Sequence, residues 1–494
     1  MRFDDVWDTD DLNAIDDALG RMEISGVTCD SRRVEGGFVF AAFPGAAADG
    51  RDFITDAVAK GAAAVIVPDD DQPSPEIEVP VIRERDPRRR YAILAAAIAG
   101  QQPQNIAAVT GTNGKTSVAW FARQLLNAAG MPAASVGTLG SLGSAPDGST
   151  VFDLSGALTT PDPVDLHRNL ADLKAHGVDH LVLEASSHGI DQRRLDGLQV
   201  RAAAFTNLSR DHLDYHLTED AYLAAKLRLF DTLVIDGGAA VVNMDGRYAE
   251  AFASAAERRA LTLTRVGEGP ENDIVIERLI AAPTGLDVTL SVFGAKRETH
   301  LPLVGGFQAS NALVALGLAV ALGADAGAAT TGLAGLKAAP GRMQFCGSHP
   351  LGAGVYVDYA HTPDALETVL RAARPHATGR VHVVFGCGGD RDAGKRPQMG
   401  KAAADLADMV YVTDDNPRTE DAAEIRRQVM AGCPDANEIG DRAEAIRAAV
   451  AGLDGGDVLI VAGKGHESGQ IVGKEVIPFV DADVVVQALS EVRL

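Results

Sequence analysis

The sequence VTGTNGKTS, residues 109–117, decides how this chain folds. An apolar run ends at its first residue, and a helix-forming run, Val118–Ala129, follows its last one. That order predicts a strand, a phosphate-binding loop and a helix. Gly111 and Gly114 allow the backbone to turn tightly and to approach an anion closely. The N–H groups at the start of the helix would then face a phosphate, helped by the helix dipole.

The polar residues of this loop fit nucleotide chemistry. Lys115 is placed to reach the outer phosphates, and the hydroxyl of Thr116 or Ser117 is placed to hold Mg²⁺. The strict pattern G-x-x-x-x-G-K-[ST] has a glycine where this chain has Val109. A glycine-rich turn with a solvated lysine is the alternative interpretation. The strand before the loop and the helix after it favour phosphate binding.

The composition indicates a multidomain globular protein. The chain has 494 residues, 46% of them hydrophobic, which suits about two to four domains with a core each. A net charge of −23 argues against general binding to nucleic acid or to a membrane surface, because both need a basic face. The four cysteines form no C-x-x-C pair, so they suggest neither zinc nor disulfides. No apolar run reaches about 18 residues and the N-terminus lacks an apolar signal core, so we expect a cytoplasmic protein without membrane insertion.

Strands alternate with helix-forming stretches along the chain and predict an α/β fold of three domains. Residues 1–87 would form a small N-terminal α/β domain, in which Ser31 and the loop Gly45–Ala48 could present hydroxyl and backbone groups to a nucleotide or sugar. Residues 88–336 would form a central P-loop ATPase-like domain on a parallel sheet, and residues 337–494 a C-terminal Rossmann-like domain. Asp86-Pro87 and the arginines after it indicate a linker into a helix. The predicted central strands are Ile106–Val109, His180–Glu184, Ala202–Thr206 and Ala240–Asn243, followed by a more antiparallel patch at Asp273–Leu303.

Acidic and imidazole side chains follow two of the predicted central strands. Glu184 ends one strand in LVLEASSHG, and His212 follows the next in TNLSRDHLDYH. The carboxyl ends of parallel strands share one edge of a sheet, so we expect both residues to lie beside the Lys115 loop. Mg²⁺ prefers oxygen ligands, and a histidine can complete a second site. Structural hydrogen bonding is the alternative for both residues.

The remaining candidate site residues each give only a weak indication of function when taken singly. Lys226 lies in a helical stretch, DAYLAAKLRLF, where spacing alone indicates a surface lysine. Arg342, in the hinge-like turn AAPGRMQF, could reach a phosphate. The strand endings GCGGDRDAGKRP, TDDNPR and GKGHE each have the character of solvated loops. Together they indicate a pocket that binds a small zwitterion through charges of both signs.

The ordered motifs carry a family resemblance. In chain order they are CDSRRV, TGTNGKTS, LTTPDP, EASSHG, TNLSRDHLDYH, PGRMQ, DYAHTPDAL, GCGGDRDAGKRP, DNPR and AGKGHE. Over nearly its whole length the chain resembles the Mur ligases, ATP-dependent amide-forming enzymes of peptidoglycan synthesis. It is most similar to the members that add the third peptide residue, in their meso-diaminopimelate-specific form. The family tolerates Val109, and one departure is Gln308, where the family usually has Asn, near the retained Asn311.

The resemblance implies three substrates, UDP-N-acetylmuramoyl-L-Ala-D-Glu, meso-diaminopimelate and ATP, with Mg²⁺ as cofactor. We expect a monomer, although the sequence itself does not give the oligomeric state. It implies ATP contacts by Gly111, Thr112, Asn113, Gly114, Lys115, Thr116, Ser117, Asn311 and Arg342. Contacts to the UDP-linked substrate are implied for Cys29, Ser31, Ala46, Ala47, Ala48, Thr159, Thr160, Ser186, Gln192 and Arg194. Contacts to meso-diaminopimelate are implied for Arg391, Asp415, Asn416, Pro417, Arg418, Gly463 and Glu467. Thr116, Glu184 and His212 match Mg²⁺ positions, Lys226 matches a carbamylated lysine (N6-carboxylysine), and Lys115, Lys226, His212 and Glu184 are the expected catalytic residues.

The implied reaction has two steps. The γ-phosphoryl group of ATP passes to the D-Glu side-chain carboxylate, and the diaminopimelate amine then attacks the acyl phosphate. Charge builds on phosphoryl oxygens, so cationic groups must be in place beforehand. The alternatives are the lysine-adding form of the same ligase, a folylpolyglutamate synthase-like ligase, and a non-catalytic nucleotide-binding protein. The N-terminal CDSRRV section speaks against the second of these, and the intact set of catalytic residues against the third.

Overall fold

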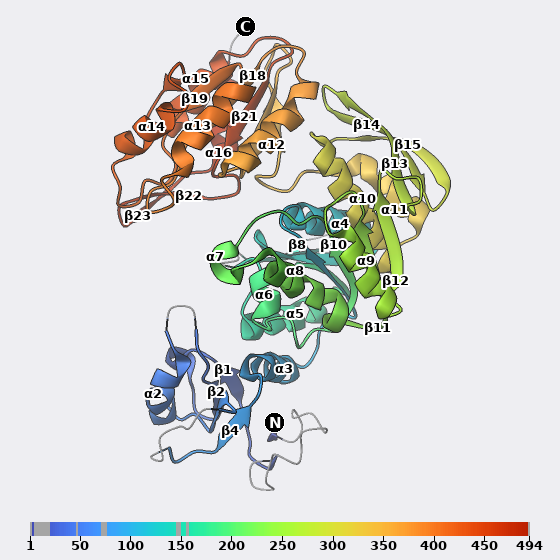
Figure 1. Ribbon diagram of the computed structural model, residues 1–494, viewed down its shortest axis with the longest axis vertical. Helices are drawn as coiled ribbons and strands as arrows, with labels where there is room; N and C mark the ends of the chain where they lie inside the picture. The colour runs from blue at the N-terminus through green and yellow to red at the C-terminus, as the bar shows by residue number, and fades with distance from the viewer. Residues whose placement is uncertain are drawn as a thin grey trace. The chain divides into compact units, whose positions relative to one another are not determined.

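The computed structural model describes residues 2–3, 20–45, 48–70, 77–144, 150–154 and 158–492. They belong to two compact units. Figure 1 shows their helices and strands, coloured from the N-terminus to the C-terminus. The first unit comprises Met1–Ala119, Leu126–Arg265 and Gly317–Ala324, and the second Trp120–Leu125, Val266–Leu316 and Asp325–Leu494. Among the described residues, no helix is sufficiently long and apolar to span a bilayer. The domain boundaries at residues 87 and 336 stay a prediction.

A four-stranded parallel sheet, in the order β1-β2-β3-β4, opens the first unit. Its elements are β1 (Gly26–Thr28), β2 (Phe38–Ala41), α2 (Ile54–Ala59), β3 (Ala64–Pro68), β4 (Val81–Glu84) and α3 (Pro87–Ala99). Successive residues of a strand point to opposite faces, so Val39 and Phe40 enter two different cores. Asp86 caps α3 by accepting a hydrogen bond from Arg89 N, and Pro87 occupies the first turn. The predicted linker at Asp86-Pro87 is therefore wrong, because these residues start the helix.

The larger sheet of the first unit places the phosphate loop at its middle. Its strand order is β12-β11-β10-β5-β9-β6-β7-β8, and β5 pairs in parallel with both β9 and β10. The strands are β5 (Asn105–Thr110), β6 (Ala133–Gly137), β7 (Gly140–Ser144), β8 (Thr150–Leu154), β9 (His180–Glu184), β10 (Val200–Phe205), β11 (Val234–Asn243) and β12 (Thr262–Gly267). The helices are α4 (Lys115–Ala128), α5 (Pro163–Ala175), α6 (Ser187–Asp191), α7 (Leu213–His216), α8 (Glu219–Arg228) and α9 (Ala249–Arg258). Val109 lies opposite Glu184 in the register, so β5 and β9 end at the same edge, as predicted.

The second unit contains an antiparallel patch and a three-layer α/β/α domain. Strands β13 (Ile274–Ala282), β14 (Gly285–Val292) and β15 (Ala295–Leu301) pair antiparallel, which confirms the patch predicted at Asp273–Leu303. Helices α10 (Gly306–Ala321) and α11 (Ala326–Gly332) follow along the chain.

The α/β/α domain is built on a six-stranded sheet in the order β16-β17-β21-β18-β19-β20. Its strands are β16 (Gln344–Ser348), β17 (Gly354–Asp358), β18 (Val381–Phe385), β19 (Met409–Val412), β20 (Asn437–Glu438) and β21 (Val458–Ala462), and a hairpin of β22 (Gly469–Val472) and β23 (Glu475–Pro478) follows. Helices α12 (Pro363–Ala373), α13 (Lys395–Leu406) and α14 (Ala422–Met430) cover one face, and α15 (Arg442–Ala451) and α16 (Asp481–Glu491) the other (Figure 1). The parallel alignment of β17, β21, β18 and β19 brings the four predicted polar strand endings to one edge.

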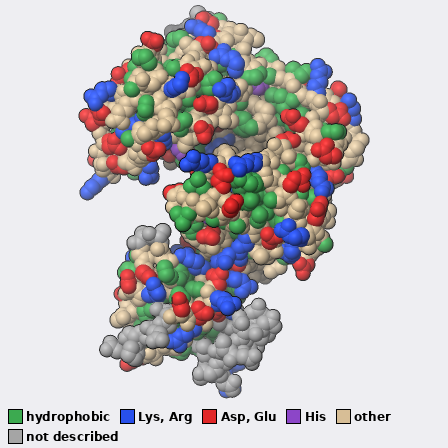
Figure 2. All heavy atoms as spheres, in the orientation of Figure 1, with side chains coloured by type: hydrophobic (Ala, Val, Ile, Leu, Met, Phe, Trp, Pro, Cys, Tyr) green, Lys and Arg blue, Asp and Glu red, His purple; other side chains and the backbone are tan. Residues whose placement is uncertain are grey.

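Ion pairs of two kinds occur in this domain. On the face drawn in Figure 2, acidic and basic side chains are interspersed, and exposed pairs such as Lys401–Asp405, with side chains 71% and 55% exposed, contribute little to stability. Arg442 and Asp481 are only 1% and 0% exposed, and the guanidinium donates two hydrogen bonds of 2.7 Å to the carboxylate. This pair joins the first turns of α15 and α16 in the interior.

Replacing Asp481 by Ala should strongly destabilise the protein, because it leaves the Arg442 guanidinium buried without its counter-ion. We expect the free energy of unfolding, measured by urea denaturation, to fall by about 3–5 kcal/mol. Lys401→Ala, which removes an exposed pair in the same domain, should change it by less than about 1 kcal/mol. If the free energy of unfolding fell no more for Asp481→Ala than for Lys401→Ala, the buried Arg442–Asp481 pair would not be the stabilising contact described here.

Candidate active site

The phosphate loop between β5 and α4 has the predicted shape. Gly111 and Gly114 have φ values of 154° and 88°, and a Cβ at Gly111 would lie 1.9 Å from Thr206 Oγ1. The residues after β10 hold the loop, because Thr112 N donates to Asn207 O at 2.8 Å and Asn113 N to Asn207 Oδ1 at 3.0 Å. The motifs did not indicate this role of the Thr206-Asn207 segment.

Val109 is compatible with the loop because it belongs to the strand. It is fully buried in β5 and pairs with Glu184 in extended conformation, so it needs none of the conformational freedom of glycine. The turn begins only at Gly111.

Two lysines converge on the loop. Lys115 Nζ donates to Gly111 O and Thr112 O, both at 2.8 Å, and Lys226 Nζ also donates to Gly111 O at 2.8 Å. Lys226 is 1% exposed and its ammonium lies 4.4 Å from the centroid of the Tyr222 ring. The expectation of a surface lysine is wrong, because Tyr222, Ala225 and Lys226 share the buried face of α8.

The environment of Lys226 disfavours its charged form. Burial, reinforced by the neighbouring Lys115 cation, lowers the pKa of Lys226 well below its ordinary value, and Asp211 only partly opposes this. A larger share of this amine is therefore neutral near pH 7 than for an ordinary lysine. A one-turn π-helix, Leu229–Leu233, directly follows α8; such turns are frequent at functional sites.

Glu184 is the buried carboxylate of the site. It is 2% exposed and accepts hydrogen bonds from Thr116 Oγ1 at 2.9 Å, Thr138 N at 2.8 Å and Thr138 Oγ1 at 3.2 Å. A Cβ at Gly137 would lie 2.1 Å from Glu184 Oε1, so β6 approaches the carboxylate closely. The structure thus joins the end of β9 to the start of α4, as predicted, and adds Thr138, which no motif singled out.

His212 lies beside Tyr222, whose hydroxyl is 3.2 Å from Thr112 Oγ1 of the phosphate loop. It has a left-handed backbone, with φ of 52°, and its ring meets those of His188 and Tyr222 at 4.8 and 6.1 Å between centroids. Burial and the nearby His212 and His216 lower the pKa of His188. Across the described part of the chain, no group of three or more His, Cys, Asp or Glu side chains could hold a metal. A cation at Thr116 and Glu184 would therefore need further ligands, such as phosphate oxygens.

The residues expected at the UDP-linked substrate fall into two groups within the first unit. Thr160 Oγ1 contacts Ser186 Oγ at 3.0 Å and donates to Glu184 O at 2.9 Å, and Arg194 donates to Thr160 O and Gln192 Oε1, both at 2.7 Å. Thr159 Oγ1 lies 3.2 Å from Thr138 Oγ1. Thr159, Thr160, Ser186, Gln192 and Arg194 thus form one network with Glu184.

Cys29 and Ser31, from the second group, follow β1 of the N-terminal sheet. Cys29 Sγ is 3.9 Å from Asp162 Oδ2, and Tyr91 donates to Asp162 Oδ1 at 2.7 Å. Burial, with Asp162 nearby, raises the pKa of Cys29 to about 11, so the thiol stays protonated. Ser31 is buried and Ala48 is exposed, whereas Ala46 and Ala47 lie outside the described residues.

The residues expected at the amino acid lie in the second unit. Asp415, Asn416 and Pro417 are buried in the turn after β19, and Arg418 follows with φ of 52°. Arg418 Nη1 donates to Gly389 O at 2.8 Å. Gly463 has φ of 113°, and a Cβ there would lie 2.8 Å from Asp415 Oδ2. The structure joins Glu467 to Asn416 by a hydrogen bond of 2.8 Å, while Arg391 is exposed.

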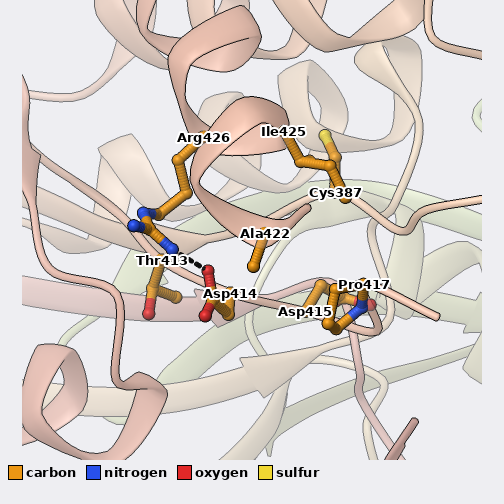
Figure 3. Close-up of a pocket in the computed structure, with 8 residues that line it drawn as sticks. All are labelled: Cys387, Thr413, Asp414, Asp415, Pro417, Ala422, Ile425 and Arg426. Atoms are coloured by element: carbon orange, nitrogen blue, oxygen red, sulfur yellow. Dashed lines mark hydrogen bonds and ion pairs between the residues drawn. The ribbon is translucent and has the colours of Figure 1, made fainter. Parts of the chain in front are cut away.

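A small pocket adjoins this turn (Figure 3). Its lining residues are Cys387, Thr413, Asp414, Asp415, Pro417, Ala422, Ile425 and Arg426. Arg426 of α14 forms an ion pair with Asp414, and this pair attaches the turn to the helix (Figure 3). For the TDDNPR ending, the interpretation as a solvated loop is wrong, because Asp415, Asn416 and Pro417 are buried and the turn packs against α14.

Asn311 and Arg342, expected at ATP, also lie in the second unit. The fully buried Gln308 joins them, since its Oε1 accepts from Asn311 Nδ2 at 3.2 Å and its Nε2 donates to Arg342 O at 3.0 Å. Gln308, where the resemblance led us to expect Asn, therefore links Asn311 to the backbone of Arg342. The Arg342 guanidinium lies 4.5 Å from the Tyr359 ring centroid.

Comparison with known proteins identifies the class. Family models match the chain in three stretches: Mur ligase family, catalytic domain, over residues 23–111; Mur ligase middle domain, over residues 109–319; and Mur ligase, glutamate ligase domain, over residues 341–465. The chain belongs to the Mur ligase family of ATP-dependent amide-forming enzymes, and the predicted three-domain α/β fold is confirmed.

Particular relatives narrow the comparison. A UDP-N-acetylmuramoyl-L-alanyl-D-glutamate--2,6-diaminopimelate ligase from Caulobacter vibrioides is 52% identical over 469 residues, which cover 95% of this chain and 96% of that protein. The ligase of the same name from Brucella melitensis biotype 1 is 51% identical over 471 residues, covering 95% of both. A solved structure of a ligase with this name superposes with a TM-score of 0.74 at 34% identity, over 99% of both chains.

More distant structures share the fold alone. A MurF ligase from Thermotoga maritima in complex with ADP has a TM-score of 0.59 at 18% identity and covers 97% of this chain and 99% of its own. A folylpolyglutamate synthase from Mycobacterium tuberculosis, complexed with ADP and AMPPCP, has a TM-score of 0.60 at 20% identity and covers 76% of this chain and 92% of its own.

Thr116→Val should weaken the fold around the buried carboxylate. The change removes the hydroxyl that donates to Glu184, so we expect the free energy of unfolding in urea to fall by about 1–3 kcal/mol. Thr116→Ser keeps the hydroxyl donor, so its free energy of unfolding should fall clearly less. Equal losses in the two variants would show that the hydroxyl bond does not matter.

Proposed function

We propose that this chain adds meso-diaminopimelate to the D-Glu side-chain carboxylate of UDP-N-acetylmuramoyl-L-Ala-D-Glu, at the expense of ATP, in peptidoglycan synthesis. The observation that carries the proposal is the meeting of the phosphate loop, through Thr116, with the buried Glu184 and the Thr160–Ser186 network. The loop proposed for the nucleotide is thereby bonded to groups that are suited to a substrate carboxylate. Two relatives named UDP-N-acetylmuramoyl-L-alanyl-D-glutamate--2,6-diaminopimelate ligase support the proposal. Their sequences are 52% and 51% identical to this one over 95% of the chain.

The chemistry balances in two steps. A D-Glu carboxylate oxygen bonds to the γ-phosphorus of ATP as the bond from that phosphorus to the β,γ-bridging oxygen breaks, and ADP leaves. The diaminopimelate nitrogen then attacks the acyl carbon and loses a proton, and inorganic phosphate leaves. Both steps need fixed positive groups near phosphoryl oxygens and exclusion of water from the acyl phosphate.

ATP would bind along Gly111–Ser117, with Asn311 and Arg342 as further contacts. The hydrogen bonds of Lys115 to Gly111 O and Thr112 O keep its charge at the loop. Lys115 would stabilise charge that develops on the transferred phosphoryl group.

Mg²⁺ fits the donor set at Glu184. Thr116 and Glu184 offer a hydroxyl and a carboxylate oxygen 2.9 Å apart, both on buried residues, which suits an ion that prefers oxygen. Thr116, Glu184 and His212 would hold it. When bound, the cation neutralises charge on phosphoryl oxygens.

The remaining substrates would be held by residues from both units. Cys29, Ser31, Ala46, Ala47 and Ala48 are proposed for the UDP end of the UDP-linked substrate. Thr159, Thr160, Ser186, Gln192 and Arg194 would bind its remaining part. Arg391, Asp415, Asn416, Pro417, Arg418, Gly463 and Glu467 would bind the amino acid.

Lys226 is proposed to carry a carbamate. Its neutral amine would bond to the carbon of CO₂ and lose a proton, which gives an anion at a position where an ordinary lysine carries a positive charge. The lowered pKa of Lys226 favours this reaction, and the anion would relieve the repulsion between Lys226 and Lys115. The product would be suited to positioning Mg²⁺.

The choice of amino acid depends on Arg418. Diaminopimelate has a second carboxylate at its far end, which lysine lacks, and a guanidinium can bind a carboxylate through two parallel hydrogen bonds. In a ligation assay that offers meso-diaminopimelate, L-lysine and L-ornithine side by side, we expect diaminopimelate to be preferred at least about 100-fold in kcat/KM. Arg418→Ala should raise the KM for diaminopimelate far more than the KM for ATP.

Arg427→Ala is the matched control, because Arg427 is 76% exposed on the neighbouring helix α14. It should leave both KM values unchanged. Comparable kcat/KM for lysine and diaminopimelate would favour the lysine-adding alternative, and turnover with a folate substrate would favour the folylpolyglutamate synthase alternative.

Lys226→Ala should be nearly inactive, and bicarbonate or a short carboxylic acid should restore part of the activity. Enzyme equilibrated with ¹³CO₂ should show a carbamate signal by NMR that the variant lacks. Because only the neutral amine reacts, the signal should grow as pH rises through the lowered pKa of Lys226. Lys401→Ala, at an exposed lysine, should keep both signal and activity; full turnover by Lys226→Ala would refute the role.

A further inference from the structure

Lys464 is a fully buried cation beside the proposed amino-acid site. It lies two residues after β21, and its side chain is 0% exposed. Its Nζ donates to Asn416 Oδ1 at 3.1 Å, to Glu467 Oε2 at 3.1 Å and to Gly469 O at 2.6 Å. An ammonium has three N–H groups, so these acceptors use its whole donor capacity. Lys464 is therefore placed to organise the site and not to touch the substrate.

We propose that Lys464 is a positioning residue for the amino-acid substrate, which it serves by fixing the side chains of Asn416 and Glu467. The inference rests on the proposed function, because those two residues are assigned to the amino acid there. The inference adds a residue that bonds only to other groups of the protein and does not contact the substrate.

The orientation of Asn416 follows from these bonds. Its Oδ1 accepts from Lys464 Nζ and from Ile471 N at 2.9 Å, and its Nδ2 donates to Glu467 Oε2 at 2.8 Å. The amide cannot turn over without placing its NH₂ group against two donors. Glu467 Oε2 in turn receives both Lys464 and Asn416, which leaves Oε1 as the oxygen suited to a substrate ammonium.

The same cation is coupled to Arg418 through the β22–β23 hairpin. Gly469, whose carbonyl accepts from Lys464, opens the hairpin. Arg418 N donates to Ile471 O at 3.0 Å, and Gly473 N donates to Arg418 O at 2.7 Å. Arg418 has a positive φ, a conformation that surrounding contacts must maintain in a non-glycine residue. Lys464 thus helps to set the separation between the proposed carboxylate-binding and ammonium-binding groups.

The test uses the full-length enzyme and steady-state kinetics with all three substrates. Lys464→Met keeps the length of the side chain but removes the ammonium. We expect the KM for meso-diaminopimelate to rise roughly 10-fold or more, since small displacements of positioning groups are costly. The KM values for ATP and the UDP-linked substrate should change by no more than about twofold. In the background of Glu467→Gln, the same substitution should have a much smaller effect, because residues that act together are not additive.

Lys401→Met is the control for loss of a lysine in this domain and should leave all three KM values unchanged. An unchanged KM for diaminopimelate, a parallel rise in all three KM values, or additive effects with Glu467→Gln would each overturn the proposal. Lys464→Gln is measured alongside, and failure of both variants to fold would also overturn it, since Lys464 would then act on stability alone. Absence of diaminopimelate turnover in the unmutated enzyme would instead refute the proposed function.

Discussion

The alignment of three parallel strand ends is the constraint on which the candidate site of the first unit depends. β5 lies between β9 and β10, with Val109 opposite Glu184 and Thr110 opposite Phe205. A shift of this register by one residue would turn the Glu184 side chain to the other face of the sheet. The phosphate loop would then lose its contact with the buried carboxylate. Its support from Asn207, just beyond β10, depends on the same alignment.

Buried lysines lie beside loops that follow strands in both units. Lys226 reaches the carbonyl of Gly111, and Lys464 reaches two side chains and a carbonyl after β21. Burying an ammonium is costly unless hydrogen bonds compensate. The two residues meet this cost differently. Lys464 has three acceptors, one of them the carboxylate of Glu467, whereas the lowered pKa of Lys226 favours its neutral form.

The α/β/α domain of the second unit contains both buried and exposed ion pairs. The Arg442–Asp481 pair joins α15 to α16, and Arg442 also donates to the carbonyl of Ala462 at 2.9 Å, next to Gly463. It therefore connects the interior of the domain to the turn that carries Lys464 and Glu467. Exposed pairs such as Lys401–Asp405 have no comparable connection, because solvent screens them and their side chains remain free to move.

The sequence by itself determined the α/β class, the phosphate loop and the strand endings at Glu184 and after β19 and β21. Local order of apolar runs, glycines and polar turns is enough for these, because strand and loop propensities act over short distances. Only the tertiary structure decided that Lys226 and Lys464 are buried, that Thr138, Tyr222 and Gln308 support the sites, and that Asp86 starts a helix instead of a linker. Each of these depends on which residues far apart in the chain pack together. Spacing within one segment cannot reveal the burial of a charged side chain, since burial is set by neighbours from other elements.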